Sequence, residues 1–292
     1  MAISSIVGPY FFIKWFRLIK SLSVPVGYGV LLPIFVLALS IYELRFLIDE
    51  LVLYSAVLIF ALIYFIDDLF GISPIVRLFL SALCGVTVLY VVQANFNLQS
   101  MIWIFCFVSM VNFFNFQDGA DLNVAILFCL MFSNFLFISE YQFTSTAAII
   151  FLIGFMCWNI FPKNIYFGDS GVFASCALLF AMTTDAGINQ NLILMLGTTL
   201  YVFADAMYVI VQRLVRKENL LSRNYLHLYQ IFNQRFGNKL YLGVTVVGSV
   251  WGAFLLHYFC DILNVEIIIS CLLVFIGLLF THWCARMLLR VC

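Results

Sequence analysis

The chain has 292 residues, of which 65% are hydrophobic and 10% are charged, and its mean hydropathy is +1.12. A soluble domain carries about 25% charged residues, so a chain this apolar cannot cover its surface with polar groups, and lipid must surround most of it. The formal net charge is zero, which gives no electrostatic reason to expect a nucleic-acid partner. The nine Cys form no Cys-x-x-Cys pair, which favours buried thiols over metal or redox chemistry.

Apolar stretches long enough for membrane helices follow one another along the chain. A helix needs about 20 mostly apolar residues to cross a bilayer. Eleven stretches approach this length: 4–21, 24–42, 50–66, 75–94, 101–117, 122–139, 144–161, 171–187, 190–211, 240–260 and 265–285. The first is the weakest, because it holds three cations. The sequence therefore predicts an all-α, polytopic integral membrane protein with about 10–11 transmembrane helices, forming a single domain over residues 1–292.

The positive charges predict how these helices are oriented. Cytoplasmic connections of membrane proteins carry an excess of Lys and Arg. If the connection after the third stretch is cytoplasmic, alternation puts every Lys and Arg except Arg45 at or near the cytoplasmic side. We therefore expect the N-terminus outside and the C-terminus in the cytoplasm.

Carboxylates gather on the same predicted side. Three cytoplasmic connections each present acids, namely Asp67 with Asp68, Asp118 with Asp121, and Asp169. Ordinary interfacial charges explain one such connection easily and three together poorly. Adjacent carboxylates repel each other unless a cation or a phosphate-bound metal lies near them. Arg77 is close in sequence to Asp67 and Asp68, although an Asp-Asp pair can also simply cap the next helix.

The second of these connections combines amides with acids. Its polar residues are Asn112, Asn115, Asp118 and Asp121. They supply hard oxygen ligands of the kind that Mg²⁺ takes, with one or two from the protein and the rest from phosphates and water. A turn between helices needs only Gly119 and one capping residue, so the additional polar groups favour a ligand site.

The third connection, Ile165 to Gly171, precedes another apolar stretch. Asp169 or Ser170 is a favourable N-cap for a helix that starts there. A helix N-terminus also suits anions. Taken alone, this motif favours the cap.

The longest cytoplasmic connection, about 212–239, holds six cations against one acid and includes Arg223 and His227. Such cations either anchor the topology and attract anionic lipid, or they hold phosphates. The cations alone do not separate these interpretations, and His227 favours the second. His257 and His282 lie in apolar runs and are expected to be structural.

Together, the motifs resemble the polyprenyl-phosphate N-acetylhexosamine-1-phosphate transferase superfamily from about residue 50 to 240. The stretch from Asp205 to Gly237 is most similar to the branch that starts bacterial O-antigen and lipopolysaccharide synthesis. The resemblance implies transfer of a sugar-1-phosphate from a UDP-N-acetylhexosamine to undecaprenyl phosphate. It also implies Mg²⁺ as the cofactor, with Mn²⁺ as a substitute, and a cytoplasm-facing site in the bacterial inner membrane. N-acetylglucosamine is the usual sugar, and 6-deoxy sugars fit equally well.

The resemblance also implies roles for individual residues. Asn115 and Asp169 match Mg²⁺ ligands, and Tyr166 takes the place of an aromatic residue that stacks on uracil. The remaining matches are Asp67 and Asp68 beside the acceptor phosphate and metal, Arg77 near the phosphates, Asp118 and Asp121 near the nucleotide, His227 in an essential loop, and Asn112 and Arg223 among the substrate-binding residues.

Three features depart from the family pattern. Only Val24 to Gly29 remains of a usually longer first cytoplasmic loop, Asn224 replaces a second His, and Leu122 stands where Gly is frequent. The first two remove cationic or protonatable groups, which leaves open a non-catalytic relative that binds lipid phosphate. An ion-coupled transporter is less favoured, because its carboxylates are expected near the bilayer midplane rather than at one face.

Overall fold

The structure is a computed structural model that describes residues 2–19, 25–42, 48–93, 97–119, 122–160, 165–186, 190–219, 226–236 and 240–289. Regular structure in these ranges is helical throughout and includes no strand, so the predicted all-α class is confirmed. The chain forms two compact units, Met1–Gly187 and Ile188–Cys292. The prediction of a single domain over residues 1–292 stays a prediction.

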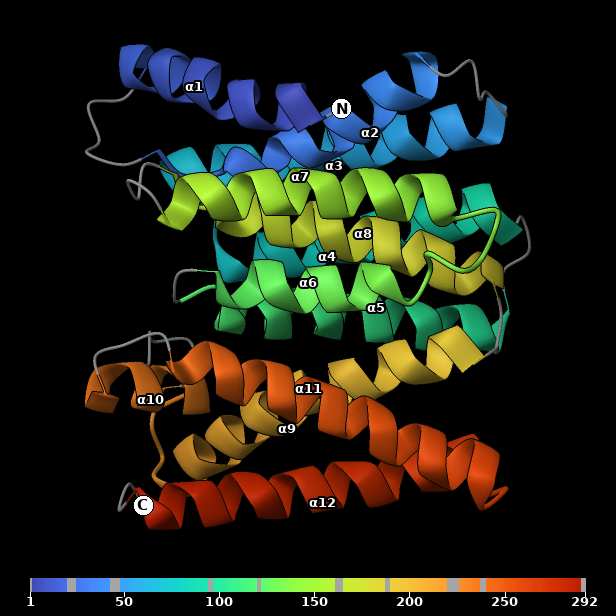
Figure 1. The fold of residues 1–292 in the computed structure, drawn as a ribbon, viewed down its shortest axis with the longest axis vertical. Coiled ribbons are helices and arrows are strands. Elements are labelled where there is room, and N and C mark those ends of the chain that lie inside the picture. Colours follow the sequence, from blue (N-terminus) through green and yellow to red (C-terminus); the bar gives the residue numbers. More distant parts are fainter. Residues whose placement is uncertain are drawn as a thin grey trace. The chain divides into compact units, whose positions relative to one another are not determined.

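The helices of the first unit run roughly side by side in Figure 1. They are α1 (Ala2–Ile19), the short 3-10 turn η1 (Tyr28–Val30), α2 (Leu31–Tyr42), α3 (Ile48–Phe70), α4 (Pro74–Gln93), α5 (Leu98–Gln117), α6 (Asn123–Ser133), α7 (Gln142–Ile160) and α8 (Gly168–Ala186). The second unit holds α9 (Gln190–Val215), α10 (Leu228–Phe236), α11 (Leu240–His257), the π-helical turn η2 (Tyr258–Ile262) and α12 (Ile267–Leu288).

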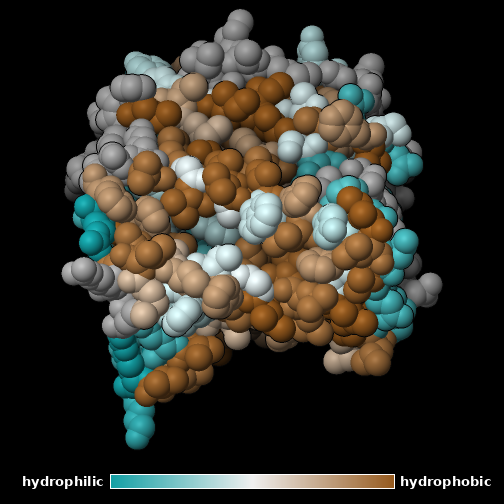
Figure 2. Space-filling view, turned by 60° about the horizontal axis from the view of Figure 1, so that its bottom comes forward, coloured by the Kyte–Doolittle hydropathy of each residue, from teal (hydrophilic) through white to brown (hydrophobic). Residues whose placement is uncertain are grey.

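Each of the eleven predicted stretches overlaps a helix. Seven helices in the described part of the chain are long and apolar enough to cross a membrane: Glu50–Phe70, Pro74–Val92, Leu98–Gln117, Gln142–Ile160, Met195–Val215, Leu240–Ile262 and Ile267–Leu288. Tyr28–Tyr42 and Asn123–Ser133 are shorter apolar helices. Hydrophobic residues cover most of the face seen in Figure 2, with hydrophilic residues toward its margins. Lipid is the solvent in which such a surface is stable, as expected for a polytopic membrane protein.

Helix α8 is the most enclosed element of the first unit. It packs against α2, α3, α4, α5, α6 and η1, and every residue from Val172 to Thr184 is buried. Small residues such as Ala174, Ser175 and Ala177 let the neighbouring helices approach closely. Helix α8 is thus surrounded by other helices of this unit, and its N-terminus lies close to the ends of several of them.

The short segment before α2 packs directly on the start of α8. The Tyr28 amide donates to the carbonyl of Tyr166 at 3.1 Å, and the Gly29 amide donates to the carbonyl of Phe167 at 3.0 Å. A Cβ atom on Gly29 would lie 2.0 Å from the Cα atom of Gly171. The backbone contact therefore requires glycine, and it fixes the segment on which Asp169 is carried.

Candidate active site

The first three acidic motifs come together at the N-terminal end of α8. Asp67 and Asp68 lie in the last turn of α3, Asp118 immediately follows α5, and Asp169 lies in the first turn of α8. Arg77 lies in the first turn of α4, which packs on both α3 and α8. Residues that are far apart in the sequence therefore form one polar cluster at a helix terminus.

Asp68 holds the first turn of α8 in place. Its Oδ1 atom accepts a hydrogen bond from the Asp169 amide at 2.8 Å, and its Oδ2 atom accepts from the Ser170 amide at 3.1 Å and the Ser170 hydroxyl at 2.7 Å. The carboxylate of one helix thus supplies the cap of another, at the end where the helix dipole favours negative charge. The cap predicted within the third motif exists, but Asp68 supplies it.

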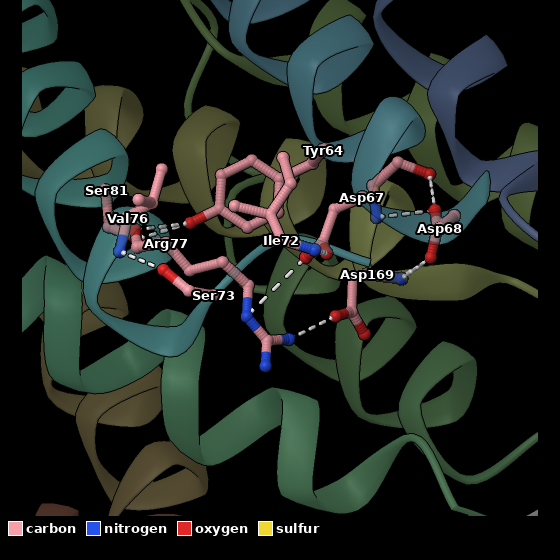
Figure 3. A network of polar contacts seen from close by, with 10 residues as sticks. Tyr64, Asp67, Asp68, Ile72, Ser73, Val76, Arg77, Ser81 and Asp169 are labelled. Carbon is pink, nitrogen blue, oxygen red and sulfur yellow. Dashed lines mark hydrogen bonds and ion pairs between the residues drawn. The ribbon is translucent and has the colours of Figure 1, made fainter. Parts of the chain in front are cut away.

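Arg77 lies between two other carboxylates (Figure 3). Its Nη1 atom donates to Asp169 Oδ2 at 2.7 Å, and its Nε atom lies 3.5 Å from Asp67 Oδ2. Asp67 also accepts from the Ile72 amide through Oδ1. The Tyr64 hydroxyl donates to the Arg77 carbonyl at 2.9 Å, which fixes the start of α4. The guanidinium therefore offsets part of the repulsion among the acids.

Asp118 completes the acidic cluster from the side of α5. It accepts a hydrogen bond from the Gly168 amide, and it interacts electrostatically with Asp169 and Asp68. Burial, followed by repulsion from these two carboxylates, raises the pKa of Asp118 well above its usual value. Burial also raises the pKa of Asp169, and the charge of Arg77 opposes that rise. Both rises disfavour the ionised form, so four carboxylates beside one arginine would be fully ionised only if a further cation were bound.

The two amides of the second motif have different surroundings. Asn112 donates through Nδ2 to the Val108 carbonyl at 2.7 Å, within its own helix. The Oδ1 atom of Asn115 is buried and has no hydrogen-bond partner among the described residues. A buried amide oxygen without a partner costs free energy, and a cation would remove that cost.

No three His, Cys, Asp or Glu side chains in the described ranges are arranged to hold a metal ion by themselves. Asn115 and Asp169 nevertheless fit the small share of ligands that a protein contributes when a diphosphate and water supply the rest. Both offer hard oxygen atoms, and the Asn115 oxygen has no other partner among the described residues.

The structure adds detail on the other predicted residues. The Tyr166 side chain is 43% exposed, so its ring is accessible to a ligand. Leu122 adopts a left-handed backbone conformation with φ 68°, which explains why glycine would be favoured at this position. Asp121, Arg223 and Asn224 lie outside the described residues.

His227 lies in the second unit, in a buried polar network that sequence patterns identified only in part. Its Nδ1 atom lies 2.9 Å from Asp205 Oδ2. Arg286 donates to Asp205 Oδ1 at 3.0 Å, and His282 lies beside the same carboxylate. Arg286 reads in sequence as a topology charge, but its side chain is 1% exposed. A cation in an apolar run is costly unless it is paired, so the position of Arg286 in the sequence already indicated a buried acidic partner.

The chain is helical, and several of its helices are apolar enough to cross a membrane. Its site holds four carboxylates and one arginine. These features are typical of membrane enzymes that transfer phosphoryl groups beside a lipid surface. Residues 51–187 match the sequence model of the family described as glycosyl transferase family 4. This region holds the whole cluster and ends where the first unit ends.

The chain is also similar to a bacterial enzyme. It is 28% identical over 195 residues to an undecaprenyl-phosphate alpha-N-acetylglucosaminyl 1-phosphate transferase from Thermotoga maritima. The match spans 63% of this chain and 62% of the relative, so the chain covers less than two thirds of the relative's length. Together with the family match, this confirms the predicted resemblance to the polyprenyl-phosphate hexosamine-1-phosphate transferase superfamily.

Proposed function

We propose that this protein transfers N-acetylhexosamine-1-phosphate from a UDP-sugar to undecaprenyl phosphate, giving a lipid-linked diphosphate sugar and UMP. The observation that carries the proposal is the meeting of Asp67, Asp68, Asp118, Asp169 and Arg77 at one end of α8. Phosphoryl transfer depends on positioning and charge stabilisation more than on covalent chemistry, and this cluster suits both. The acceptor and sugar that the relative's description names support the same substrates here.

The proposed setting follows from the charge pattern and the family resemblance. The protein lies in the bacterial inner membrane, and its acidic cluster faces the cytoplasm, where nucleotide sugars are made. The reaction is then the first membrane step of O-antigen, lipopolysaccharide or a related cell-envelope polysaccharide. The donor is UDP-N-acetylglucosamine or a 6-deoxy-N-acetylhexosamine counterpart.

The acceptor phosphate is largely a dianion at neutral pH, because its second pKa is about 6. It therefore needs orientation more than deprotonation. An acceptor oxygen attacks the sugar-linked phosphorus of the donor and forms a new diphosphate bridge. The bond from that phosphorus to the bridging oxygen breaks, and UMP leaves with the electron pair on that oxygen.

The two adjacent acids are suited to different tasks. Both oxygens of Asp68 accept hydrogen bonds from the first turn of α8, so Asp68 shapes the site. Asp67 Oδ2 has no hydrogen-bond partner among the described residues and faces Arg77 at ion-pair distance. Asp67 is therefore better placed to orient the acceptor phosphate or to take a residual proton. Arg77, beside it, binds the phosphates.

The remaining residues bind the donor. The exposed ring of Tyr166 stacks on uracil, and Asn112, Asp118 and Asp121 contact the nucleotide and phosphates. The family resemblance alone adds Arg223 to the substrate-binding residues and His227 to an essential loop. Asn115 and Asp169 would hold Mg²⁺, or Mn²⁺ in its place, through their oxygen atoms. When bound, the ion would neutralise charge that develops on the diphosphate and on UMP.

The test is a donor panel with purified full-length protein in detergent. UMP release is measured with undecaprenyl phosphate, Mg²⁺ and a series of UDP-N-acetylhexosamines, with and without a chelator. Chelator-sensitive release with one donor would support the reaction and identify the sugar. A folded protein that releases UMP from no donor would contradict the proposal and favour a non-catalytic protein that binds lipid phosphate.

A further inference from the structure

The second unit buries a carboxylate that accepts hydrogen bonds from three directions. Asp205 Oδ2 lies 2.9 Å from His227 Nδ1, while Oδ1 accepts from the Leu228 amide at 2.9 Å and from Arg286 Nη2 at 3.0 Å. The side chains of Asp205, His227 and Arg286 are all buried. An ionised carboxylate only accepts hydrogen bonds, so His227 must donate from Nδ1. In the neutral ring, the lone pair is then on Nε2.

Arg286 holds the segment around His227 from the other side. Its Nη1 atom donates to the Leu226 carbonyl at 2.6 Å, and its guanidinium lies 4.4 Å from the ring centroid of Tyr208 on α9. The backbone before His227 is therefore fixed by Arg286, and the backbone after it is fixed by Asp205 at Leu228. A planar guanidinium can make both contacts at once, whereas a lysine ammonium on a flexible stem cannot hold the same geometry.

A buried arginine in a membrane helix is costly unless other groups compensate its charge, so the partners of Arg286 need an explanation. Arg286 is in the last turn of α12, outside the region that matches the family model. One explanation is a tether that only attaches α12 to the rest of the unit. Its two terminal nitrogen atoms, however, contact the carbonyl beside His227 and the carboxylate that orients the His227 ring.

We propose that Arg286 and Asp205 are positioning residues that fix the location of His227 and keep its proton on Nδ1. For the role of His227 in catalysis, this inference rests on the proposed transferase function. The position and tautomer of the His227 ring do not depend on the proposed function. Each positioning contact is made to Asp205, to the His227 ring or to the backbone on either side of that ring.

His282 lies near the same carboxylate but plays a smaller part. Its Nδ1 atom is 3.7 Å from Asp205 Oδ1, which is beyond hydrogen-bond distance, and its ring stacks on Tyr201 at 5.3 Å. His257 lies at the end of α11, where its Nδ1 atom is 2.6 Å from Asp261 Oδ2. These three are the only histidines in the chain. Ring nitrogen signals can therefore be assigned from single substitutions.

The first measurement is nitrogen NMR of the full-length protein in detergent, labelled at histidine with ¹⁵N. At a pH where His227 is neutral, the wild-type ring should show the Nδ1-protonated tautomer. Arg286→Met should give a mixture of tautomers or a ring in exchange, and Arg286→Lys should give an intermediate result. His257 is the internal control, and Trp283→Leu, at an exposed position on the same helix, is the matched variant. Both should leave the His227 signals unchanged.

The second measurement is UMP release by the same variants. Arg286→Met should lower kcat roughly 100-fold, the scale of loss for a displaced catalytic group, with little change in the donor KM. Arg286→Lys should recover part of the activity, and Trp283→Leu should keep all of it. If Arg286→Met fails to fold, Arg286→Lys and Asp205→Asn carry the test, and Asp205→Asn should populate both tautomers.

The outcomes separate the two proposals. Wild-type His227 signals in every folded Arg286 and Asp205 variant would overturn the positioning role, whatever the activity. A wild-type protein that shows the Nδ1-protonated tautomer but releases no UMP would support the positioning geometry and overturn the proposed function alone.

Discussion

Asp169 lies where the end of α3, the start of α4 and the start of α8 meet, and its contacts explain why one side chain can matter so much. It pairs with Arg77 at 2.7 Å, and its amide is capped by Asp68. Its charge interacts with Asp67, Asp68 and Asp118. A neutral side chain of the same shape would keep the packing and remove the charge at the centre of the cluster.

We expect Asp169→Asn to lower UMP release at least about 100-fold, because the substitution removes the negative charge from a residue that we propose as a Mg²⁺ ligand. The measurement is initial rate at saturating Mg²⁺, with folding checked by size-exclusion chromatography and helix content. Asp185→Asn, at the other end of α8, is the matched control and should keep its activity. Near-normal turnover of Asp169→Asn would rule out the assignment.

Asp68 has a structural task that its neighbour does not share. Asp68→Ala removes three hydrogen bonds from the first turn of α8. We expect the free energy of unfolding to fall by about 1–2 kcal/mol, the usual cost of a lost N-cap. Thermal unfolding in detergent, followed by circular dichroism, measures this change.

Ser73→Ala is the control for that comparison. The Ser73 hydroxyl makes one exposed cap contact at the start of α4, with Val76 at 3.4 Å, so its loss should change the unfolding temperature little. Equal unfolding temperatures for the Asp68 and Ser73 variants would show that the capping contacts of Asp68 contribute nothing measurable.

At the scale of elements, the site depends on how closely the segment before α2 approaches α8. Gly29 and Gly171 allow backbone contact between the two, and the amides of Tyr28 and Gly29 bond the residues before Gly168. The short first loop, which departs from the family pattern, thus contributes to the shape of the site through its backbone rather than through cationic side chains.

Gly29→Ala should therefore separate these segments. Its Cβ atom would overlap backbone atoms that cannot move aside, so we expect destabilisation of about 1–3 kcal/mol and reduced UMP release. Gly243→Ala, in α11, has nothing within 4 Å of the added atom and should be neutral or slightly stabilising. Thermal unfolding of both variants checks this, and an unchanged Gly29→Ala protein would contradict the close approach.

At the scale of the whole molecule, the charge pattern makes a prediction about orientation that helix geometry does not test. The positive residues put the C-terminus in the cytoplasm and the connection between η2 and α12 outside. Paired C-terminal fusions test this, because green fluorescent protein folds in the cytoplasm and alkaline phosphatase is active only after export.

The expected result is fluorescence without phosphatase activity. An epitope inserted after Asn264 should be accessible to antibody from outside, which gives an independent control in the full-length chain. Active phosphatase at the C-terminus would show that the orientation is the reverse of the predicted one. The acidic cluster would then lie on the wrong side for a cytoplasmic donor.

The sequence by itself determined the helical class and the positions of the helices, because membrane burial requires long apolar runs whose backbone bonds are satisfied within each helix. It also identified the motifs of Asp67, Asn115 and Asp169, since polar residues at the ends of apolar runs are conspicuous.

Only the tertiary structure decided what each polar residue contacts. Asp68 caps a helix about a hundred residues away in the sequence, and Arg286 supports His227 from the last helix. No periodic pattern in the sequence predicts either contact, because each depends on which helix ends meet in space. Hydropathy and charge patterns report the environment of a segment, whereas hydrogen bonds between segments are set by packing.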